Sequence, residues 1–261
     1  MANPVEIQGS LMYLREDDSG ISEELLLKGI HEPLSTVKVL ETIKDGMNVL
    51  EIGANIGYFA LLEAKQGAVV HAIEPVPENM EVLLKSIEAN GYDDMFVYMC
   101  AIGDKNETMK MRVTKYSNSG TLVDMDTPKT ASDWYHGWLS EIHTTDLYVE
   151  CYTLDTFVEK YDIGPIDYIR MDVEGFETNV IKGATKTLEN MTSGSTLFIE
   201  IHPVIYRRPK VAIKNMIKTI LKHGFTPTFI DPPQDEYEGE FIDQEFLYGA
   251  AHCPRIFFVK E

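Results

Sequence analysis

The sequence predicts an α/β fold with a mostly parallel, doubly wound sheet and helices on both faces. From about residue 48, short apolar runs alternate with helical patterns, and parallel strands need such crossover connections. The expected strands are 48–52, 68–73, 95–102, 166–171, 196–201, 225–230 and 256–259, and the expected helices are 57–65, 77–90, 176–190 and 210–223. A polar loop separates the last two strands, which favours an antiparallel edge hairpin.

Start and stop signals support these elements. The first strand, 48–52, is a short apolar run that ends at Gly53, and the second, 68–73, ends at Glu74-Pro75. The helix 77–90 begins with a proline in its first turn and stops before Gly91. Its apolar positions share one helix face and are Met80, Leu83, Leu84 and Ile87.

We expect a mostly helical N-terminal preface, residues 1–45, and a single domain, residues 46–261, with an insertion at 104–152. The insertion contains two strand-like pieces, 109–113 and 148–152, around an irregular stretch with Trp134, Tyr135 and Trp138. Long irregular insertions in compact α/β domains are usually functional or mobile. This stretch is therefore either an apolar lid over a ligand or an anchor that attaches the loop to the body of the domain. Residues 231–245 are acidic, with no Lys or Arg, and are expected to be a solvated loop.

The charge of the chain excludes several classes of partner. Its 261 residues include 42 Asp and Glu against 23 Lys and Arg, a net charge of −19. Nucleic acids and anionic membranes attract basic surfaces, and we find no basic stripe, so neither is expected as a partner. The three cysteines lie far apart, and neither a signal peptide nor an 18-residue apolar stretch occurs. A soluble, cytoplasmic protein is therefore expected.

A glycine loop after the first strand indicates a nucleoside cofactor. Residues 51–57, Glu-Ile-Gly-Ala-Asn-Ile-Gly, connect this strand to the next helix, and glycine lets the backbone approach a ligand closely. Glu74 ends the second strand, 21 residues after Gly53. In a doubly wound fold these two strand ends flank the ligand crevice. A carboxylate there can accept hydrogen bonds from both hydroxyls of a ribose.

The charges around this loop favour S-adenosylmethionine over a nicotinamide dinucleotide. A dinucleotide requires Gly-x-Gly-x-x-Gly, whereas Ala54 and Asn55 separate the two glycines here. Glu51 would repel a pyrophosphate but suits a cation. S-adenosylmethionine lacks phosphate and carries a ribose diol, a sulfonium and an ammonium group.

These motifs resemble the FkbM family of S-adenosylmethionine-dependent methyltransferases. The resemblance rests on 49–57 with 72–79, on 100–104, on 152–155, on 166–177 followed by 181–184, and on 198–202. The stretch from Asp172 to Glu177 is the most specific part, with Arg170 where lysine is usual. The resemblance implies a Rossmann-like class I methyltransferase with a seven-stranded sheet and an antiparallel last strand. It also implies O-methylation of a sugar or natural-product hydroxyl.

The resemblance also assigns cofactor-binding roles. Gly53, Asn55 and Gly57 hold the methionine part, Glu74 holds the ribose and the Ala101 region borders the adenine. Glu51 orients the turn or meets the amino group through water, and Asp172 faces the sulfonium or the acceptor. The complete expected set is Glu51, Gly53, Asn55, Ile56, Gly57, Glu74, Pro75, Ala101 and Asp172.

An alcohol acceptor must lose a proton, so a general base is expected near the methyl group. The expected catalytic set is His202, Asp172, Glu174 and Glu177, and Glu200 is a further candidate because it shares a strand face with His202. His202 has the ordinary pKa suited to this role, whereas Glu177 could instead stabilise a helix N-terminus. These carboxylates and His202 could also bind a divalent metal, but the resemblance requires none and we expect none.

The sequence therefore predicts an S-adenosylmethionine-dependent methyltransferase that acts on a hydroxyl of a small molecule, sugar or glycan. Two alternatives stay open at this point. One is an NAD-dependent oxidoreductase. The other is a cofactor-binding fold that serves as a protein-interaction module through residues 231–245 and the aromatic insertion. The acceptor and the oligomeric state cannot be derived from the sequence.

Overall fold

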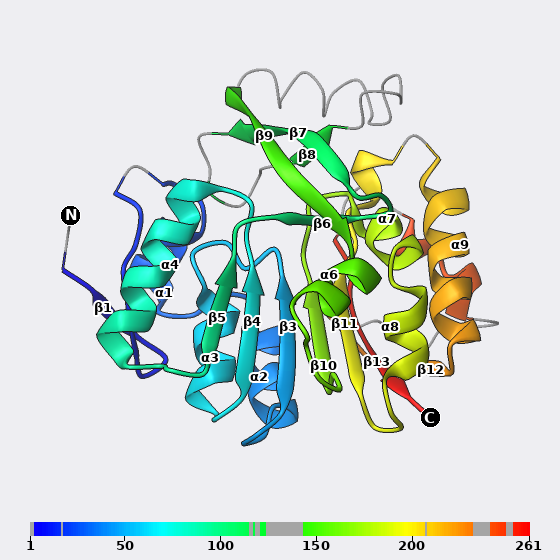
Figure 1. Cartoon of the computed structure of the whole chain (residues 1–261), viewed down its shortest axis with the longest axis horizontal. Helices are drawn as coiled ribbons and strands as arrows, with labels where there is room; N and C mark the ends of the chain where they lie inside the picture. Colours follow the sequence, from blue (N-terminus) through cyan, green and yellow to red (C-terminus); the bar gives the residue numbers. More distant parts are fainter. Residues whose placement is uncertain are drawn as a thin grey trace.

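A seven-stranded sheet forms the centre of the protein, seen here in a computed structural model (Figure 1). The structure describes residues 3–16, 18–114, 117, 121–123, 143–206, 208–231, 241–248 and 253–261. The strand order is β12-β13-β11-β10-β3-β4-β5. Their bounds are β3 (Asn48–Ile52), β4 (Val69–Ile73), β5 (Met95–Tyr98), β10 (Tyr168–Met171), β11 (Thr196–Glu200), β12 (Phe225–Asp231) and β13 (Arg255–Lys260).

The pairing of these strands confirms the Rossmann-like class I methyltransferase fold that the sequence predicts. Five strands pair in parallel, from β11 through β10, β3 and β4 to β5, while β13 is antiparallel to both β11 and β12. The last strand of the chain therefore lies inside the sheet, and β12 forms its edge.

Helices cover both faces of this sheet because successive strand residues point to opposite sides. Val49, Tyr168 and Phe198 pack with the first group of helices: α1 (Ile21–Lys28), α2 (Pro33–Thr42), α3 (Tyr58–Lys65) and α4 (Pro77–Asn90). The neighbouring Leu50, Ile169 and Leu197 pack on the other face, with α6 (Leu154–Lys160), α7 (Glu177–Lys182), α8 (Thr185–Asn190) and α9 (Pro209–Lys222). The two cores thus hold the sheet between two helical layers.

A second, four-stranded sheet lies across the carboxyl ends of the central strands (Figure 1). It contains β6 (Ala101–Gly103), β7 (Glu107–Thr114), β8 (Thr121–Val123) and β9 (His143–Thr153) in the order β6-β9-β7-β8. The single strand expected over 95–102 is therefore wrong: β5 ends at Tyr98, and β6 joins the other sheet. Trp134, Tyr135 and Trp138 lie outside the described residues.

The expected helix over 176–190 is also wrong, because it is divided into α7 and α8 at Gly183. A Cβ at Gly183 would lie 2.1 Å from the carbonyl oxygen of Gly103, so a glycine is needed where the chain passes this close to β6. The described residues also contain three short 3₁₀ helices: Pro203–Ile205, Phe241–Asp243 and Glu245–Leu247. No helix within the described ranges has the length and apolarity needed to cross a membrane.

The segment expected as a helical preface begins with an antiparallel hairpin, β1 (Val5–Ile7) and β2 (Ser10–Met12), before α1 and α2. The hairpin is joined to the helices by hydrogen bonds: Lys65 Nζ donates to the Gln8 carbonyl at 2.6 Å, and the Leu11 amide donates to Asn90 Oδ1 at 2.8 Å. In the acidic segment, Asp231 is not solvated as expected, because it is 6% exposed and accepts a 2.7 Å hydrogen bond from Ser35 Oγ. Residues 232–240 lie outside the description.

Candidate functional site

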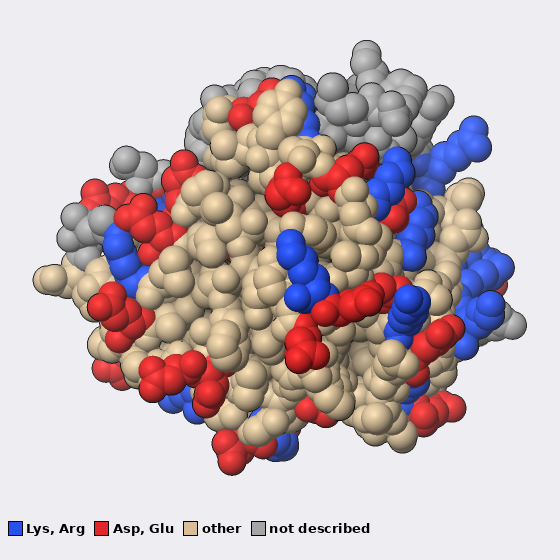
Figure 2. Space-filling model, viewed as in Figure 1, with Lys and Arg blue, Asp and Glu red and all other residues tan. Residues whose placement is uncertain are grey.

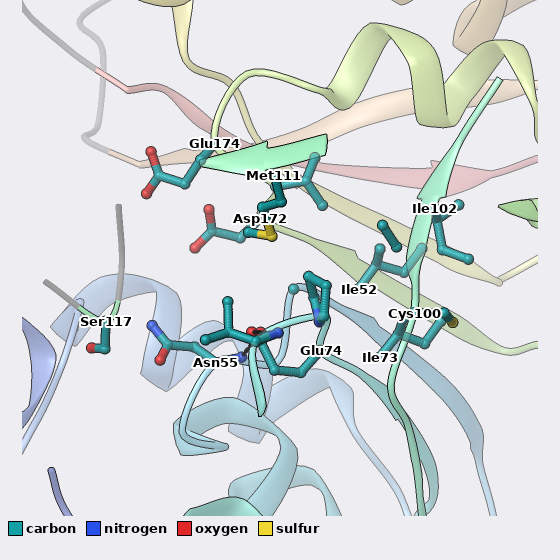
Figure 3. A pocket seen from close by; sticks show the side chains of 15 residues that line it. Ile52, Asn55, Ile73, Glu74, Cys100, Ile102, Met111, Ser117, Asp172 and Glu174 are labelled. Carbon is teal, nitrogen blue, oxygen red and sulfur yellow. Dashed lines mark hydrogen bonds between the residues drawn. The ribbon is translucent and has the colours of Figure 1, made fainter. Parts of the chain in front are cut away.

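A cavity of about 640 Å³ opens at the carboxyl ends of β3, β4 and β10. Figure 3 shows its two ends: Asp172, Glu174, Asn55 and Ser117 gather at one end, and the apolar side chains of Ile52, Cys100 and Ile102 lie at the other. The complete lining is Ile52, Gly53, Asn55, Ile73, Glu74, Pro75, Val76, Cys100, Ala101, Ile102, Met111, Ser117, Asp172, Val173 and Glu174. A mainly apolar lining with a few polar groups is typical of a small-molecule site.

The glycine loop shapes one wall of the cavity. Gly53 has φ +85°, and a Cβ there would lie 1.9 Å from the backbone oxygen of Asp172. Glycine is thus required where the end of β3 approaches the end of β10. The amides of Gly53 and Ala54 both donate to the Ile73 carbonyl, at 2.9 and 3.0 Å, which fixes the loop to the end of β4.

Glu74 holds this loop through its carboxylate. Its Oε2 accepts from the Asn55 amide at 2.8 Å, and its Oε1 accepts from the Val76 amide at 2.9 Å and Asn79 Nδ2 at 3.2 Å. Burial raises the pKa of Glu74 to about 7, although these hydrogen bonds oppose the increase. A carboxylate offers about four acceptor positions, so about one remains for a ligand.

The structure brings most, but not all, of the expected cofactor-binding residues to this cavity. Gly53, Asn55, Glu74, Pro75, Ala101 and Asp172 line it. Ile56 and Gly57 lie behind the loop instead. Ile56 is fully buried in the core, and a Cβ at Gly57 would lie 2.3 Å from Leu83 Cδ1.

Glu51 does not line this cavity either, and it faces Arg170. Its Oε1 accepts a 2.7 Å hydrogen bond from Arg170 Nη1, and both side chains are buried. The Arg170 guanidinium also lies 3.8 Å from the ring centre of Phe59. Burial raises the pKa of Glu51 to about 7 despite the opposing charge of Arg170. The pKa of the nearby Glu63 is raised well above 4.5 by burial and by the charge of Glu51.

A second cavity, of about 560 Å³, adjoins the first and shares Gly53, Asn55, Asp172 and Glu174 with it. Charged groups from distant parts of the chain line it, among them His31, Glu32, Glu51, Arg170, Glu200 and Arg255. Burial would raise the pKa of Glu32, but the hydrogen bond from His31 and the charges of Arg170 and Arg255 hold it at about 2. Sequence reasoning missed His31, Glu32 and Arg255, because no motif links them to the glycine loop.

The four expected catalytic residues meet beside both cavities. Asp172 and Glu174 follow β10 and line both of them, and Figure 3 shows their carboxyl groups pointing the same way. His202 follows β11, and its Nε2 lies 3.8 Å from Asp172 Oδ1 and 3.6 Å from Glu174 Oε2. Burial raises the pKa of Glu174 to about 8, despite the opposing charge of His202.

Glu177 lies behind His202 and lines neither cavity. Glu177 is fully buried, and its Oε1 lies 2.6 Å from His202 Nδ1. The same oxygen accepts a hydrogen bond from the Gly175 amide at 2.9 Å, and Tyr206 donates a hydrogen bond to the other oxygen, Oε2. Burial lowers the pKa of His202, but the carboxylates of Glu174 and Glu177 outweigh burial and raise it well above 6.5. A histidine already protonated at neutral pH is a poor proton acceptor, so the ordinary pKa expected for His202 is wrong.

Comparison with protein families then gives a decisive match. The family described as methyltransferase FkbM domain matches residues 51–227. The chain belongs to the FkbM methyltransferase family. It is therefore an S-adenosylmethionine-dependent methyltransferase, as the loop and Glu74 lead us to expect. Membership of this family favours methyl transfer over the hydride transfer of an NAD-dependent oxidoreductase.

Solved structures show the same fold at low sequence identity. An rRNA methylase from Streptococcus thermophilus is 12% identical with a TM-score of 0.50, over 88% of this chain and 97% of that chain. A putative rRNA-methylase from Clostridium thermocellum is 11% identical with a TM-score of 0.51, over 87% and 93%. At this identity the likeness extends to the fold alone. A search of curated proteins found no match.

Proposed function

We propose that this FkbM methyltransferase transfers a methyl group to a hydroxyl of a small polyhydroxylated molecule, a sugar or a glycan. The second cavity is the observation that carries the proposal. It adjoins the cofactor cavity at Asp172 and Glu174, and its lining is rich in carboxylates and guanidinium groups. Such groups hydrogen-bond to several hydroxyls at once.

The first cavity fits the cofactor. Glu74 retains about one acceptor position for a ribose hydroxyl, and Ala101, Ile102 and Met111 supply an apolar wall for an adenine ring. Asp172 would face the positive charge of the sulfonium, since its carboxylate lines this cavity. When bound, S-adenosylmethionine supplies an electrophilic methyl group and leaves as S-adenosylhomocysteine.

The residues beside the cavities would align the acceptor and remove its proton. Methyl transfer requires the acceptor oxygen in line with the S–CH₃ bond, about 3–3.5 Å from the carbon. Asp172 and Glu174 line both cavities and so lie where such an oxygen would enter. We assign proton removal to the carboxylates of Asp172 and Glu174, which lie beside His202, and we assign Glu177 the positioning of His202.

The charged surface bears on nucleic acid as an alternative acceptor. Asp and Glu are scattered over the visible face, while Lys and Arg gather at its right side, over α9 (Figure 2). Lys210, Lys214, Lys218 and Lys222 recur every fourth residue of α9 and share one helix face. From the sequence we expected no basic stripe, and this expectation is wrong. However, Lys214 pairs with Asp243, and the net charge of −19 still supports a non-nucleic-acid acceptor.

A binding assay and a transfer assay test this proposal. S-adenosylhomocysteine at 100 times its Kd should stabilise the protein by about 2.7 kcal/mol, and NAD at the same concentration should give no shift. Isotope-labelled methyl transfer to sugars, phenolic compounds and structured RNA is then followed by mass spectrometry. Methylation of hydroxyl groups in the sugar panel is expected. No shift with S-adenosylhomocysteine, or transfer to RNA alone, would overturn the proposal.

A further inference from the structure

Two carboxylates and an imidazole meet at the boundary between the two cavities. One ligand atom from each of Asp172, Glu174 and His202 lies within 4.8 Å of the other two. We propose that these three side chains bind a divalent cation, such as Mn²⁺, which holds the acceptor oxygen. The use of the cation in catalysis rests on the proposed function, whereas its binding does not.

The spacing of the ligand atoms suits a cation. Nitrogen and oxygen ligands lie about 2.0–2.2 Å from a first-row divalent metal, so two ligand atoms of one ion lie about 2.8–3.6 Å apart in octahedral or tetrahedral geometry. The distances from His202 Nε2 to Glu174 Oε2 and Asp172 Oδ1, 3.6 and 3.8 Å, exceed an N–H···O hydrogen bond. They approach that separation, and the third pair of ligand atoms lies within 4.8 Å, so rotation of the Asp172 and Glu174 side chains would close the site.

The groups behind His202 give independent support. Metal-binding histidines usually donate their second ring N–H to a carboxylate, which fixes the ring and the tautomer. Here the Nδ1 of His202 donates to the carboxylate of Glu177, at 2.6 Å, and a cation at Nε2 would displace the proton from that nitrogen. Glu177 is itself held by Tyr206 and the Gly175 amide, so Nε2 is directed at the two carboxylates.

A carboxylate oxygen without a hydrogen-bond partner among the described residues lies at the same position. Asp172 Oδ1 is buried and has no hydrogen-bond partner in the described part of the chain, although it faces His202. Leaving a buried acceptor unsatisfied destabilises the folded protein, and the cost is larger when the acceptor is charged. A cation beside it would remove that cost and offset the repulsion among Asp172, Glu174 and the nearby Glu200.

Carboxylates suit Mn²⁺, and imidazole is a common ligand of other first-row divalent metals. Three protein ligands leave coordination positions for a water or an acceptor hydroxyl. A bound hydroxyl would lose its proton to solvent more easily, its oxygen would form the new C–O bond, and the electron pair of the broken S–CH₃ bond would stay on sulfur. Glu174 would then hold the cation rather than accept the proton.

The direct test is titration of the purified protein with MnCl₂, with free Mn²⁺ followed by electron paramagnetic resonance. We expect saturable binding of one ion. Glu174→Gln and His202→Ala should each weaken it by at least about tenfold, and Glu177→Gln by about 10–100-fold, as losses of outer-shell partners do. His71→Asn is the matched control. That histidine is also buried, 9% exposed, and its pKa is lowered by burial alone, so it has no carboxylate cluster to lose.

S-adenosylhomocysteine binding by each variant reports on folding and separates the two proposals. If Glu174→Gln and His202→Ala both bind S-adenosylhomocysteine and their Mn²⁺ affinity is unchanged, the metal site is overturned and the proposed function stands. Mn²⁺ binding without S-adenosylhomocysteine binding would support the site and overturn the function. Glu200, His202 and Cys253 form a competing group. Loss of Mn²⁺ binding in Cys253→Ser, with Glu174→Gln unaffected, would therefore also overturn the assignment.

Discussion

Replacing Glu74 by glutamine tests the assignment of the ribose subsite most directly. Three protein donors already occupy the carboxylate: the amides of Asn55 and Val76 and the side chain of Asn79. About one acceptor position is left for a ribose hydroxyl. A hydrogen bond to a charged group contributes about 1.5–3 kcal/mol, and 1.36 kcal/mol corresponds to a factor of ten. Glu74→Gln should therefore weaken binding of S-adenosylhomocysteine by about 10–150-fold.

Isothermal titration calorimetry measures this change. Glu78→Gln is the matched control, because Glu78 is exposed on the first turn of α4, four residues away. Its Kd should equal that of the original protein. The circular dichroism spectrum of Glu74→Gln shows whether the loop change has unfolded the domain. A folded Glu74→Gln protein whose Kd changes less than about threefold would refute the assigned ribose contact.

Two further predictions concern the buried charges of the site. Burial raises the pKa of Glu74 from 4.5 in the unfolded chain to about 7, so its contribution to stability is complete below pH 4.5 and is lost as the pH rises through 7. Urea denaturation between pH 4.5 and 8 should show a falling free energy of unfolding, with a shallower slope in Glu74→Gln, and equal slopes would contradict the prediction. Arg170→Gln leaves Glu51 in the core without its cation. It should therefore lower the free energy of unfolding by about 3–5 kcal/mol, and a loss below about 1 kcal/mol in urea denaturation would show that the pair is unimportant.

The central sheet and the glycine loop were predictable because their signals are local. An apolar run that stops at Gly53, and a second that stops at Glu74, are visible in short windows of sequence. Parallel pairing then places both strand ends on one edge of the sheet. The stretch from Asp172 to Glu177 was likewise found as a motif, since all its residues follow one strand.

Other parts of the site depend on contacts between residues far apart in the sequence. Glu51 was expected at the cofactor, but it is 119 residues from Arg170 and becomes its partner only when β3 and β10 pair in register. His202 was expected to have an ordinary pKa. Its real environment arises where the end of β11 meets the first turn of α7, which places Glu177 against Nδ1.

The sequence alone thus determined the class of fold, the cofactor and the residues at the strand ends, because strand periodicity, glycine turns and carboxylate spacing are properties of short segments. Only the tertiary structure decided which charged groups share the second cavity. His31, Glu32 and Arg255 come from opposite ends of the chain and meet there through packing. Packing between distant segments also sets the protonation of two site residues: burial raises the pKa of Glu174, and the carboxylates of Glu174 and Glu177 raise the pKa of His202.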